Sequence, residues 1–414
     1  MISPAEAMVL IRRHAVKPKI KIARLGECLG AVLAADIRAP FPMPVADNSA
    51  MDGFVIRSKD AGLASVKNSV RLKIIGTLKA GDSKQVHLVS GTACRIMTGA
   101  FMPQGGDCVI AKEDAVIVGN HLIVKHSVCE GQHIRRRGEE TRKGQKLLTQ
   151  GVILHPARIG ILATFGYARV PVYCKPKVAV LATGSELVTP GKKLSRGKIY
   201  DSNSWMVCAA LERMGIDPSR VLTLRDDRGK VKKAILDVLR ESDYLLLLGG
   251  VSVGDYDVVK DALKQSGVKT IFWKVSQKPG KPLFLGRKYK KVVFGLPGNP
   301  AAVFTCFYEY VYPALRQTMG FVRPGLEEET VKVSGRVLPD SKRCLFLKAK
   351  MEVRSSWRLP KARILSHQGS HMLSSLAEAD GFLKVPASGN SAPNKKGFQM
   401  DFLPYEVDGE KDVK

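Results

Sequence analysis

The sequence lacks the cysteine spacings that hold zinc or build a disulfide framework. Its 414 residues include eight cysteines but no C-x-x-C pair, and the two nearest, Cys94 and Cys108, are fourteen positions apart. Zinc sites usually take closely spaced cysteines, and disulfide frameworks belong to short chains that are dense in cysteine. We therefore expect reduced thiols and a cytoplasmic protein.

Long apolar runs are also missing. The longest one, YLLLLGGVSVG, is far shorter than the roughly 20 residues that a membrane-spanning helix needs. Arg12 and Arg13 interrupt the apolar residues near the N-terminus, which is not the pattern of a signal peptide. The sequence therefore predicts neither a membrane partner nor a secretory leader.

Acidic residues are scarce relative to basic ones. Sixty-six Lys and Arg stand against thirty-eight Asp and Glu, which gives a net charge of +28, and residues 260–291 hold ten basic side chains with Asp261 as their one acid. Such a surplus attracts anions but says little about the fold. Aromatic residues make up only 7% and do not alternate with the basic runs, so no specific nucleic-acid partner is predicted.

The order of helical and extended patterns predicts four regions. Ser3, Pro4 and Glu6 have the pattern of a helix capping box, and further helices are expected at 26–36 and within 145–170. Short apolar runs between turn residues fill 54–135 and resume after Pro324. We expect a small helical linking domain (1–45 and 140–175), a β-rich N-terminal module (46–139), an α/β domain (176–325) and a C-terminal β-barrel (326–408).

The third region alternates strands with helices, which is typical of a mostly parallel sheet. Its runs VAVLATG and YLLLLGG are apolar throughout, as expected of strands that are covered on both faces. The fold class predicted for the chain is therefore multidomain α/β, with a doubly wound, mostly parallel sheet in this region.

Polar, glycine-rich segments follow the predicted strands of this region. In an open α/β sheet, ligands bind outside the carboxyl ends of the strands. The connections at the opposite edge, such as ERMGIDPS, hold ordinary turn residues. The sequence therefore predicts an anion site at the carboxyl edge, built from TGSE (183–186), RDD (225–227), GGVSVGDYD (249–257), KVSQKPGK (274–281) and LPGNP (296–300).

The loop GGVSVG precedes a predicted helix, so its backbone N–H groups can cradle a phosphate. The residues concerned are Gly249, Gly250, Ser252 and Gly254. The fingerprints of Rossmann dinucleotide sites and of P-loops are absent from these loops, which argues against both of those classes.

Charged side chains at the same edge suit a phosphorylated ligand and a metal ion. Lys278 and Lys281 flank a Pro-Gly turn and can reach an oxyanion as point charges. Three carboxylates could hold Mg²⁺ together with phosphate oxygens, namely Glu186, Asp226 and Asp257. The neighbouring Asp227 and Asp255 are expected to be helix caps.

The stretch PVADNSAMDGF (44–54) holds two acids, Asp47 and Asp52. Asn48, Asp52 and Gly53 are all turn-forming residues, so a tight turn alone could explain them. The residue types by themselves do not decide whether either carboxylate belongs to a site.

These segments resemble those of one family. TGSEL, IYDSN, RDD, GGVSVGDYD, FWKVSQKPGKP and GLPGNP, together with DNSAMDGF, RIMTGA, IRRRGEE and SHQGSH, are similar in sequence and order to the molybdopterin molybdenumtransferases, which are the MoeA proteins and the gephyrin E domain. The resemblance spans about residues 5–405. It implies an enzyme that takes adenylylated molybdopterin and molybdate, with Mg²⁺, and releases AMP and Mo-molybdopterin. It also implies a four-domain homodimer with a cleft shared between subunits.

The resemblance assigns site residues by motif. It places functional carboxylates at Asp52, Glu186, Asp226 and Asp257, and places Asp47 in a role that fixes the loop. Further positions that match functional residues or that would bind the ligand are Thr98, Arg137, Lys274, Lys278, Lys281, Pro297, Gly298, Pro300 and Ser370. The chain departs from the family at Glu140, where Asp is usual, and at Ser185, where some members have Asp.

Two other functions stay open from the sequence. A molybdopterin adenylyltransferase would use the same α/β region one step earlier in cofactor synthesis, although the segments carrying DNSAMDG and HQGSH would then be superfluous. A basic scaffold or binding protein would explain the net charge, and the resemblance to gephyrin gives that reading some support. Other cofactor-biosynthesis proteins and client apoenzymes are possible partners.

Overall fold

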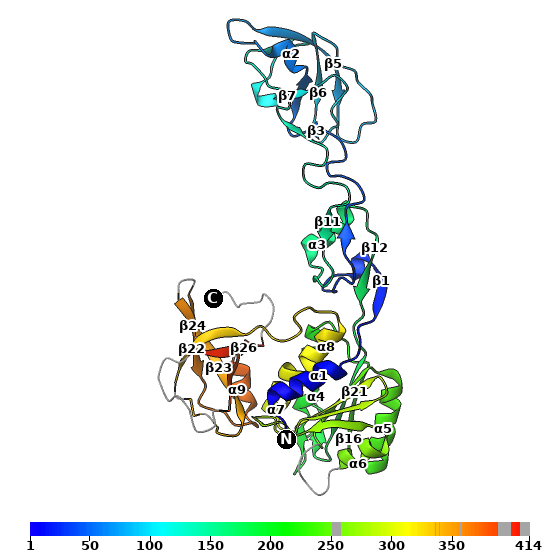
Figure 1. Cartoon of the computed structure of the whole chain (residues 1–414), viewed down its shortest axis with the longest axis vertical. Coiled ribbons are helices and arrows are strands. Elements are labelled where there is room, and N and C mark those ends of the chain that lie inside the picture. The colour runs from blue at the N-terminus through cyan, green and yellow to red at the C-terminus, as the bar shows by residue number, and fades with distance from the viewer. Residues whose placement is uncertain (251–257, 336, 339, 356–357, 388–398, 406–414) are drawn as a thin grey trace. The chain divides into compact units, whose positions relative to one another are not determined.

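The computed structural model describes residues 1–250, 258–335, 337–338, 340–355, 358–387 and 399–405 (Figure 1). The chain divides into two compact units. The first comprises residues 1–34, 151–155 and 169–414, and the second comprises 35–150 and 156–168. Each is described by itself below. In the described part of the chain, no helix has the length and apolar character needed to span a membrane.

A six-stranded mixed sheet forms the centre of the first unit, in the order β16-β13-β17-β21-β20-β18. The first four strands are parallel, and the last two run antiparallel to their neighbours. The predicted doubly wound, mostly parallel sheet is therefore confirmed. The strands are β13 (Val178–Thr183), β16 (Arg220–Leu224), β17 (Tyr244–Leu248), β18 (Lys269–Trp273), β20 (Phe284–Lys288) and β21 (Lys291–Leu296).

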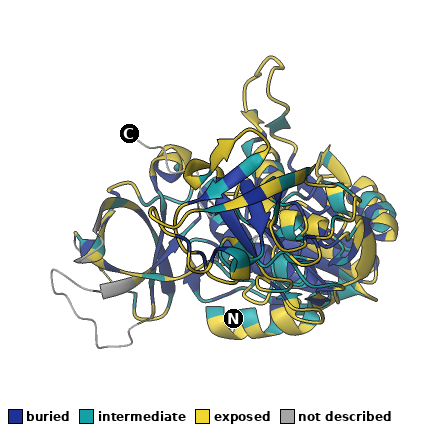
Figure 2. Cartoon of the chain, turned by 90° about the horizontal axis from the view of Figure 1, so that it is seen from above, coloured by how far each residue is buried: buried dark blue, intermediate teal, exposed yellow. Residues whose placement is uncertain are grey.

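Alternate residues of the central strands enter two different cores. Leu246 of β17 packs with α4 (Ser202–Arg213) and α7 (Pro300–Cys306), whereas Leu245 and Leu247 pack with α5 (Arg228–Glu241) and α6 (Val258–Gln265). Successive side chains of a strand point to opposite faces, so a strand that is apolar throughout needs helices on both. In Figure 2 the buried strands are dark blue, and the outer faces of the helices are yellow.

Local sequence fixes the helix starts of this unit. Ser3 and Glu6 form the expected capping box of α1 (Pro4–His14), with the Glu6 carboxylate accepting from the Ser3 backbone N–H at 2.7 Å. Asp201 caps α4, and Asp227 caps α5 by accepting from the Lys230 N–H at 3.0 Å. Residues 300–318 are helical and form α7, a π-helical stretch η3 (Phe307–Val311) and α8 (Tyr312–Thr318).

The C-terminal part of the unit is a closed five-stranded barrel, as predicted. Its ladder runs β23-β24-β22-β26-β25 and closes because β25 also pairs with β23. The strands are β22 (Glu329–Ser334), β23 (Cys344–Ser355), β24 (Arg358–Ile364), β25 (Gly381–Val385) and β26 (Gln399–Pro404), with α9 (Leu373–Glu378) between β24 and β25. The short β19 (Gln277–Lys278) joins the start of β23, which links this barrel to the α/β part.

The second unit is β-rich, with a six-stranded sheet in the order β7-β4-β6-β5-β9-β8. A short ladder between β3 (Asn48–Ser49) and β10 (Ile134–Arg135) holds the segments DNSAMDGF and IRRRGEE side by side. The other strands and helices are β2 (Ile37–Arg38), β4 (Gly53–Ile56), α2 (Ser58–Ala61), β5 (Val70–Leu78), β6 (Thr92–Ile96), β7 (Cys108–Ala111), η2 (Lys112–Asp114), β8 (Val116–Val118), β9 (His121–Val124), β11 (Lys146–Leu148) and α3 (Pro156–Thr164).

The prediction of a helix at 26–36 was wrong. The segment holds only a 3₁₀ turn, η1 (Leu25–Glu27), after which Val32 and Leu33 form bridges with Ile153 and Val172. Gly30 has φ +73°, which is incompatible with a continuing α-helix. The residues before this segment form β1 (Ile20–Arg24), which pairs antiparallel with β12 (Arg169–Tyr173). The division into four domains stays a prediction. All eight cysteines are free thiols.

Candidate functional site

The carboxyl ends of three parallel neighbours, β13, β17 and β21, meet at one edge of the sheet. A pocket of about 770 Å³ lies there. Its lining includes eight of the residues singled out from the sequence, namely Glu186, Gly249, Gly250, Lys278, Lys281, Pro297, Gly298 and Ser370. The fold therefore brings together segments that lie up to about 190 positions apart in the chain.

Two glycines let the backbone approach closely at the floor of this pocket. Gly249 has φ +83°, and a Cβ on it would lie 2.8 Å from the Thr183 carbonyl oxygen. Gly250 has φ +65°, and a Cβ there would lie 2.3 Å from Val259 Cγ2. The hydroxyl of the buried Thr183 has no hydrogen-bond partner among the described residues. This corner therefore offers a polar group that a ligand could satisfy.

The two aspartates after β16 are used differently. Asp227 is bound to the first turn of α5, with Oδ1 on the Lys230 N–H and Oδ2 3.7 Å from Lys230 Nζ. Asp226 accepts from the Ser185 N–H at 2.9 Å through Oδ2, and the Ser185 hydroxyl accepts from the Asp226 N–H at 3.2 Å. Oδ1 of Asp226 makes no hydrogen bond with a described residue. Asp226 is thus held in place with one oxygen available, whereas Asp227 is a cap.

Glu186 lies in the loop after β13, next to Ser185, which is the residue that hydrogen-bonds Asp226 of the loop after β16. The carboxylate oxygens of Glu186 come within 2.7 and 2.8 Å of the place where a Cβ on Gly184 would stand, so the glycine makes room for the side chain. Glu186 and Asp226 supply the hard oxygen donors that suit Mg²⁺. No group of three or more metal-binding side chains occurs among the described residues. Asp257, the third predicted ligand, lies outside the described residues, as do Ser252, Gly254 and Asp255.

Buried hydrogen bonds hold the loop that carries Lys278 and Lys281. Gln277, which is 1% exposed, donates from Nε2 to the Pro279 carbonyl at 3.0 Å and accepts from the Tyr310 hydroxyl. Cys306 Sγ packs against Gly280, where a Cβ would lie 2.5 Å away. Burial raises the pKa of the Cys306 thiol, so it stays protonated. The two lysines are therefore mounted on a rigid turn.

A second loop at the pocket comes from the C-terminal barrel. Asn299 Nδ2 donates to Ser370 Oγ at 2.9 Å, and the Ala301 N–H donates to the Ser370 carbonyl at 3.0 Å. Lys348, which is 3% exposed, supports this loop because its Nζ donates to the carbonyls of Gly369 and Met372. Burial lowers the pKa of Lys348. The barrel thus contributes a fixed wall to the pocket.

In the second unit, the carboxylates of Asp47 and Asp52 are held in different ways. Both oxygens of Asp47 are occupied, Oδ1 by the Arg137 N–H at 2.7 Å and Oδ2 by Arg136 Nη1 at 2.8 Å. Asp52 uses only Oδ1, which accepts from the N–H and the hydroxyl of Thr98 at 2.7 and 2.8 Å. These hydrogen bonds lower the pKa of Asp52, with the backbone bond first. Asp52 therefore presents a fixed, charged carboxylate with a free oxygen.

Three family models match the chain in sequence order. They are described as the MoeA N-terminal region (residues 2–166), a probable molybdopterin binding domain (179–317) and the MoeA C-terminal region (330–404). A molybdopterin molybdenumtransferase of Staphylococcus aureus strain Mu50 is 32% identical over 406 residues, which cover 96% of this chain and 94% of that protein. The chain belongs to the molybdopterin molybdenumtransferase family. It is thus an enzyme of molybdenum cofactor biosynthesis.

Further relatives agree with this assignment. Molybdopterin molybdenumtransferase 2 of Mycobacterium tuberculosis strain H37Rv is 34% identical over 370 residues, covering 87% of this chain and 90% of that one. A crystal structure of a MoeA molybdopterin biosynthesis protein from Pyrococcus horikoshii superimposes with a TM-score of 0.83 at 28% identity, covering 98% of this chain and all of that chain. The likeness to this fold thus covers 98% of the chain.

Several of the residues predicted for a molybdenumtransferase site do not line the carboxyl-edge pocket. Lys274 points elsewhere, with its Nζ 4.2 Å from the centre of the Trp273 ring, and its backbone has φ +75°. Asp226 and Pro300 lie beside the pocket without lining it. Asp52, Thr98 and Arg137 belong to the second unit.

Sequence reasoning missed the residues that hold the loops of this site. Gln277, Tyr310 and Cys306 were not singled out as site residues, yet all three are buried. Tyr310 lies in η3, and π-helical turns often occur at functional sites. Lys348 was not predicted as part of the site either. A useful signal could have been the polar Gln277 immediately before the Lys-Pro-Gly-Lys turn.

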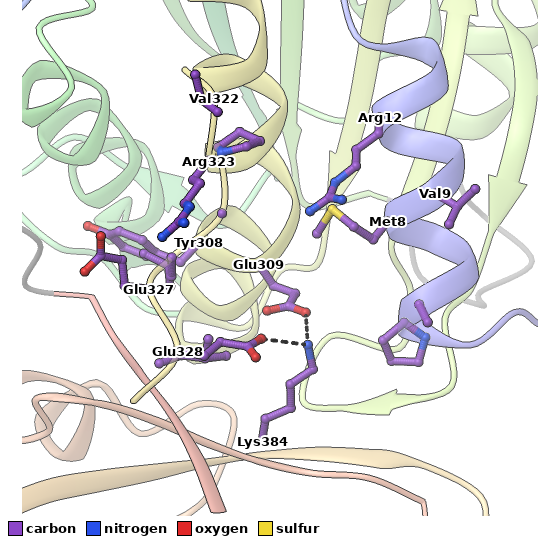
Figure 3. Close-up of a pocket in the computed structure, with 16 residues that line it drawn as sticks. Met8, Val9, Arg12, Tyr308, Glu309, Val322, Arg323, Glu327, Glu328 and Lys384 are labelled. Carbon is purple, nitrogen blue, oxygen red and sulfur yellow. Dashed lines mark hydrogen bonds and ion pairs between the residues drawn. The ribbon is translucent and has the colours of Figure 1, made fainter. Parts of the chain in front are cut away.

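Another pocket of the first unit lies elsewhere, and its volume is about 880 Å³. It is enclosed by α1, by η3, by the segment 322–328 and by β25 (Figure 3). Its inner charges neutralise each other, because Lys384 Nζ lies 2.9 Å from Glu309 Oε1 and 4.0 Å from Glu328 Oε1. The smaller pocket at the carboxyl edge, with its paired lysines, is the better candidate for an anionic substrate of the family.

A tyrosine-to-phenylalanine change tests the anchor of the lysine loop. In Tyr310→Phe, Gln277 Oε1 loses the hydrogen bond that the Tyr310 hydroxyl donates. We therefore expect a loss of about 1–2 kcal/mol in the free energy of unfolding and a several-fold higher KM for the anionic substrates. Tyr289→Phe is the matched control, because Tyr289 is 87% exposed. A Tyr310→Phe protein with a lowered melting temperature but an unchanged KM would show that the network serves stability alone.

Proposed function

We propose that the chain inserts molybdate into adenylylated molybdopterin, with release of AMP, to give Mo-molybdopterin. The observation that carries the proposal is the carboxyl-edge pocket, whose lining includes two lysines together with Glu186 and Gly249-Gly250. That combination suits an anionic, phosphorylated substrate. The full-length likeness to molybdopterin molybdenumtransferases supports the same reaction.

The lysine loop would attract and hold anions. Molybdate is a dianion, and Lys278 and Lys281 are supplied from one rigid turn that lies in the pocket. The backbone of Gly249 and Gly250 lines the same pocket, where it can approach phosphate oxygens without side-chain hindrance. Because these donors are fixed before the substrate arrives, less entropy is lost when it binds.

The carboxylates would hold a magnesium ion. Asp226 and Glu186 offer the oxygen donors, and Asp257 is the third proposed ligand. When bound, Mg²⁺ supplies charge that polarises the phosphoryl oxygens of the phosphoanhydride. A water oxygen forms a new bond to the AMP phosphorus as its bond to the bridging oxygen breaks, which releases AMP. Molybdate loses one oxygen as water, which takes up the two dithiolene protons, as molybdenum gains two bonds to the dithiolene sulfurs of the pterin. None of the cysteines of the chain is needed for this step.

We also propose that the chain acts as a cytoplasmic homodimer, as its resemblance to the family implies. Cofactor-biosynthesis proteins and client apoenzymes would be further partners. The chain's +28 net charge would draw anionic substrates toward the protein at low ionic strength.

The reaction can be tested directly with purified protein, adenylylated molybdopterin, molybdate and Mg²⁺. We expect AMP in the chromatogram and a product that activates an apo-molybdoenzyme. AMP at the level of a heat-killed control would contradict the proposal. Transfer of AMP from ATP to free molybdopterin would instead support the adenylyltransferase, which the matches to both MoeA flanking regions disfavour. DNA binding that survives physiological salt would favour the basic scaffold.

Asp52 and Asp47 provide a matched pair for the part of the proposal that rests on the second unit. Asp52→Asn keeps an oxygen for Thr98 but removes the charge, and we expect AMP release to fall by about 10- to 100-fold with the fold intact. Asp47→Asn weakens the contact with Arg136, so we expect a lower melting temperature of the unit and a smaller loss of activity. Full activity in Asp52→Asn would remove this carboxylate from the site.

A further inference from the structure

A third pocket, of about 280 Å³, lies at the opposite edge of the central sheet. Helix α4 begins near the carboxyl edge, where its cap Asp201 accepts from the Thr223 hydroxyl. Its last residue, Arg213, lines this pocket together with Met214 and Gly215, which follow it. Helix α8 supplies another wall. The pocket shares no lining residue with the carboxyl-edge pocket, so it is a separate place on the first unit.

Arg316 of α8 is held rigidly in this pocket. Its guanidinium carbon lies 4.1 Å from the centre of the Phe321 ring and 5.1 Å from that of Tyr312. Nη1 donates to the Tyr312 hydroxyl at 2.8 Å and to the Gly325 carbonyl at 3.3 Å. A guanidinium fixed between aromatic rings keeps its planar fork in one orientation, which suits recognition of a carboxylate or a phosphate.

This guanidinium has no counter-ion in the described part of the chain. Arg316 forms no ion pair there, its buried Nε has no hydrogen-bond partner, and Nη2 donates to none of the described residues. The pocket also contains Lys175, whose Nζ lies 2.6 Å from the place where a Cβ on Gly215 would stand, and Arg213. No Asp or Glu among the described residues lines it. A partly buried cation without a partner is costly, and an anion would offset that cost.

Much of the remaining lining is aromatic or sulfur-containing. Tyr308, Tyr405 and Tyr312 are only 7–8% exposed, and they line the pocket together with Met214 and Met319 and with the aliphatic side chains of Leu29, Ile153 and Ala210. Aromatic and methionine side chains favour a flat ring as a neighbour. We propose that this pocket binds a small planar anion, a single aromatic or heteroaromatic ring that carries a carboxylate or a phosphate, with Arg316 bonding the anionic group.

The test uses the full-length protein with two probes, 4-hydroxybenzoate and phenyl phosphate, in titrations followed by ligand-observed NMR. We expect saturable binding, with a Kd of about 1 mM or lower for at least one probe. Arg316→Met should weaken binding by about tenfold or more, since a charge-assisted hydrogen bond is lost, and Arg316→Lys should lie in between. The better probe tells whether a carboxylate or a phosphate is the preferred group.

Matched variants keep the result interpretable. Lys175→Gln changes an exposed side chain, so it should weaken binding several-fold even if Arg316→Met folds poorly. Arg240→Gln, which removes an exposed arginine paired only with Asp237, and Lys278→Gln should leave binding unchanged. Absence of saturable binding, or equal binding by the wild type, Arg316→Lys and Lys175→Gln, overturns the proposal. Binding that is lost in Lys278→Gln would assign the probes to the carboxyl edge and overturn it too.

Discussion

Replacing Asp226 with asparagine should lower the rate of AMP release by about 100-fold or more, whereas the same change at Asp227 should leave it nearly unaltered. Asparagine keeps the size of the side chain and an oxygen that can accept from the Ser185 N–H, so Asp226→Asn removes the charge and little else. Loss of one fixed electrostatic group at a reacting centre typically costs about 3 kcal/mol of transition-state stabilisation.

Asp227→Asn is the control for net charge, because it removes one negative charge from the adjacent position. Asparagine is about as good a helix cap as aspartate, so α5 should keep its start at Arg228. AMP release and melting temperature are measured for both variants under identical conditions. Equal rates in the two variants would mean that Asp226 has no special part in the reaction and that Glu186 and Asp257 suffice.

The contrast between these two aspartates shows which features of the site can be predicted from the sequence. The segment RDD follows a predicted strand, which places it at the carboxyl edge of the sheet. Asp227 precedes a predicted helix, which assigns it as the N-cap of α5. Both inferences use only residues that are close in sequence. The same local logic predicts the capping box at Ser3 and the two-sided cores of β13 and β17. Local patterns suffice there because neighbours within a few positions determine the structure.

Local patterns fail where a distant segment decides the structure. The stretch 26–36 has helical composition, but Val32 and Leu33 form β-bridges with Ile153 and Val172 instead. The two acids of DNSAMDG are indistinguishable by residue type, and they separate only because Arg136 and Arg137 occupy both oxygens of Asp47. The support of the lysine loop by Tyr310 depends on a contact across 33 positions that no local pattern encodes.

Lys384→Met should lower the stability of the first unit by about 3 kcal/mol at neutral pH. The ammonium of Lys384 is the nearest counter-charge of Glu309, whose side chain is only 9% exposed, and Glu328 nearby adds repulsion. Removing one partner of a buried pair leaves the other charge unpaired, which costs about 3–5 kcal/mol. In the double variant Lys384→Met with Glu309→Met, most of the loss should be recovered, since no charge stays buried. Thermal unfolding of the three proteins measures the coupling.

The pH dependence of that loss gives a second, independent check. Burial raises the pKa of Glu309 above its ordinary value of 4.5, and Lys384 opposes the rise, so the pKa should be higher still in Lys384→Met. A carboxyl group with a raised pKa in the folded state contributes stability at low pH and loses it as the pH rises through that pKa. The deficit of Lys384→Met should therefore be largest at neutral pH and shrink toward pH 4.5, where Glu309 becomes neutral. A deficit that stays constant over this range would point to lost packing of the lysine stem rather than to an unpaired carboxylate.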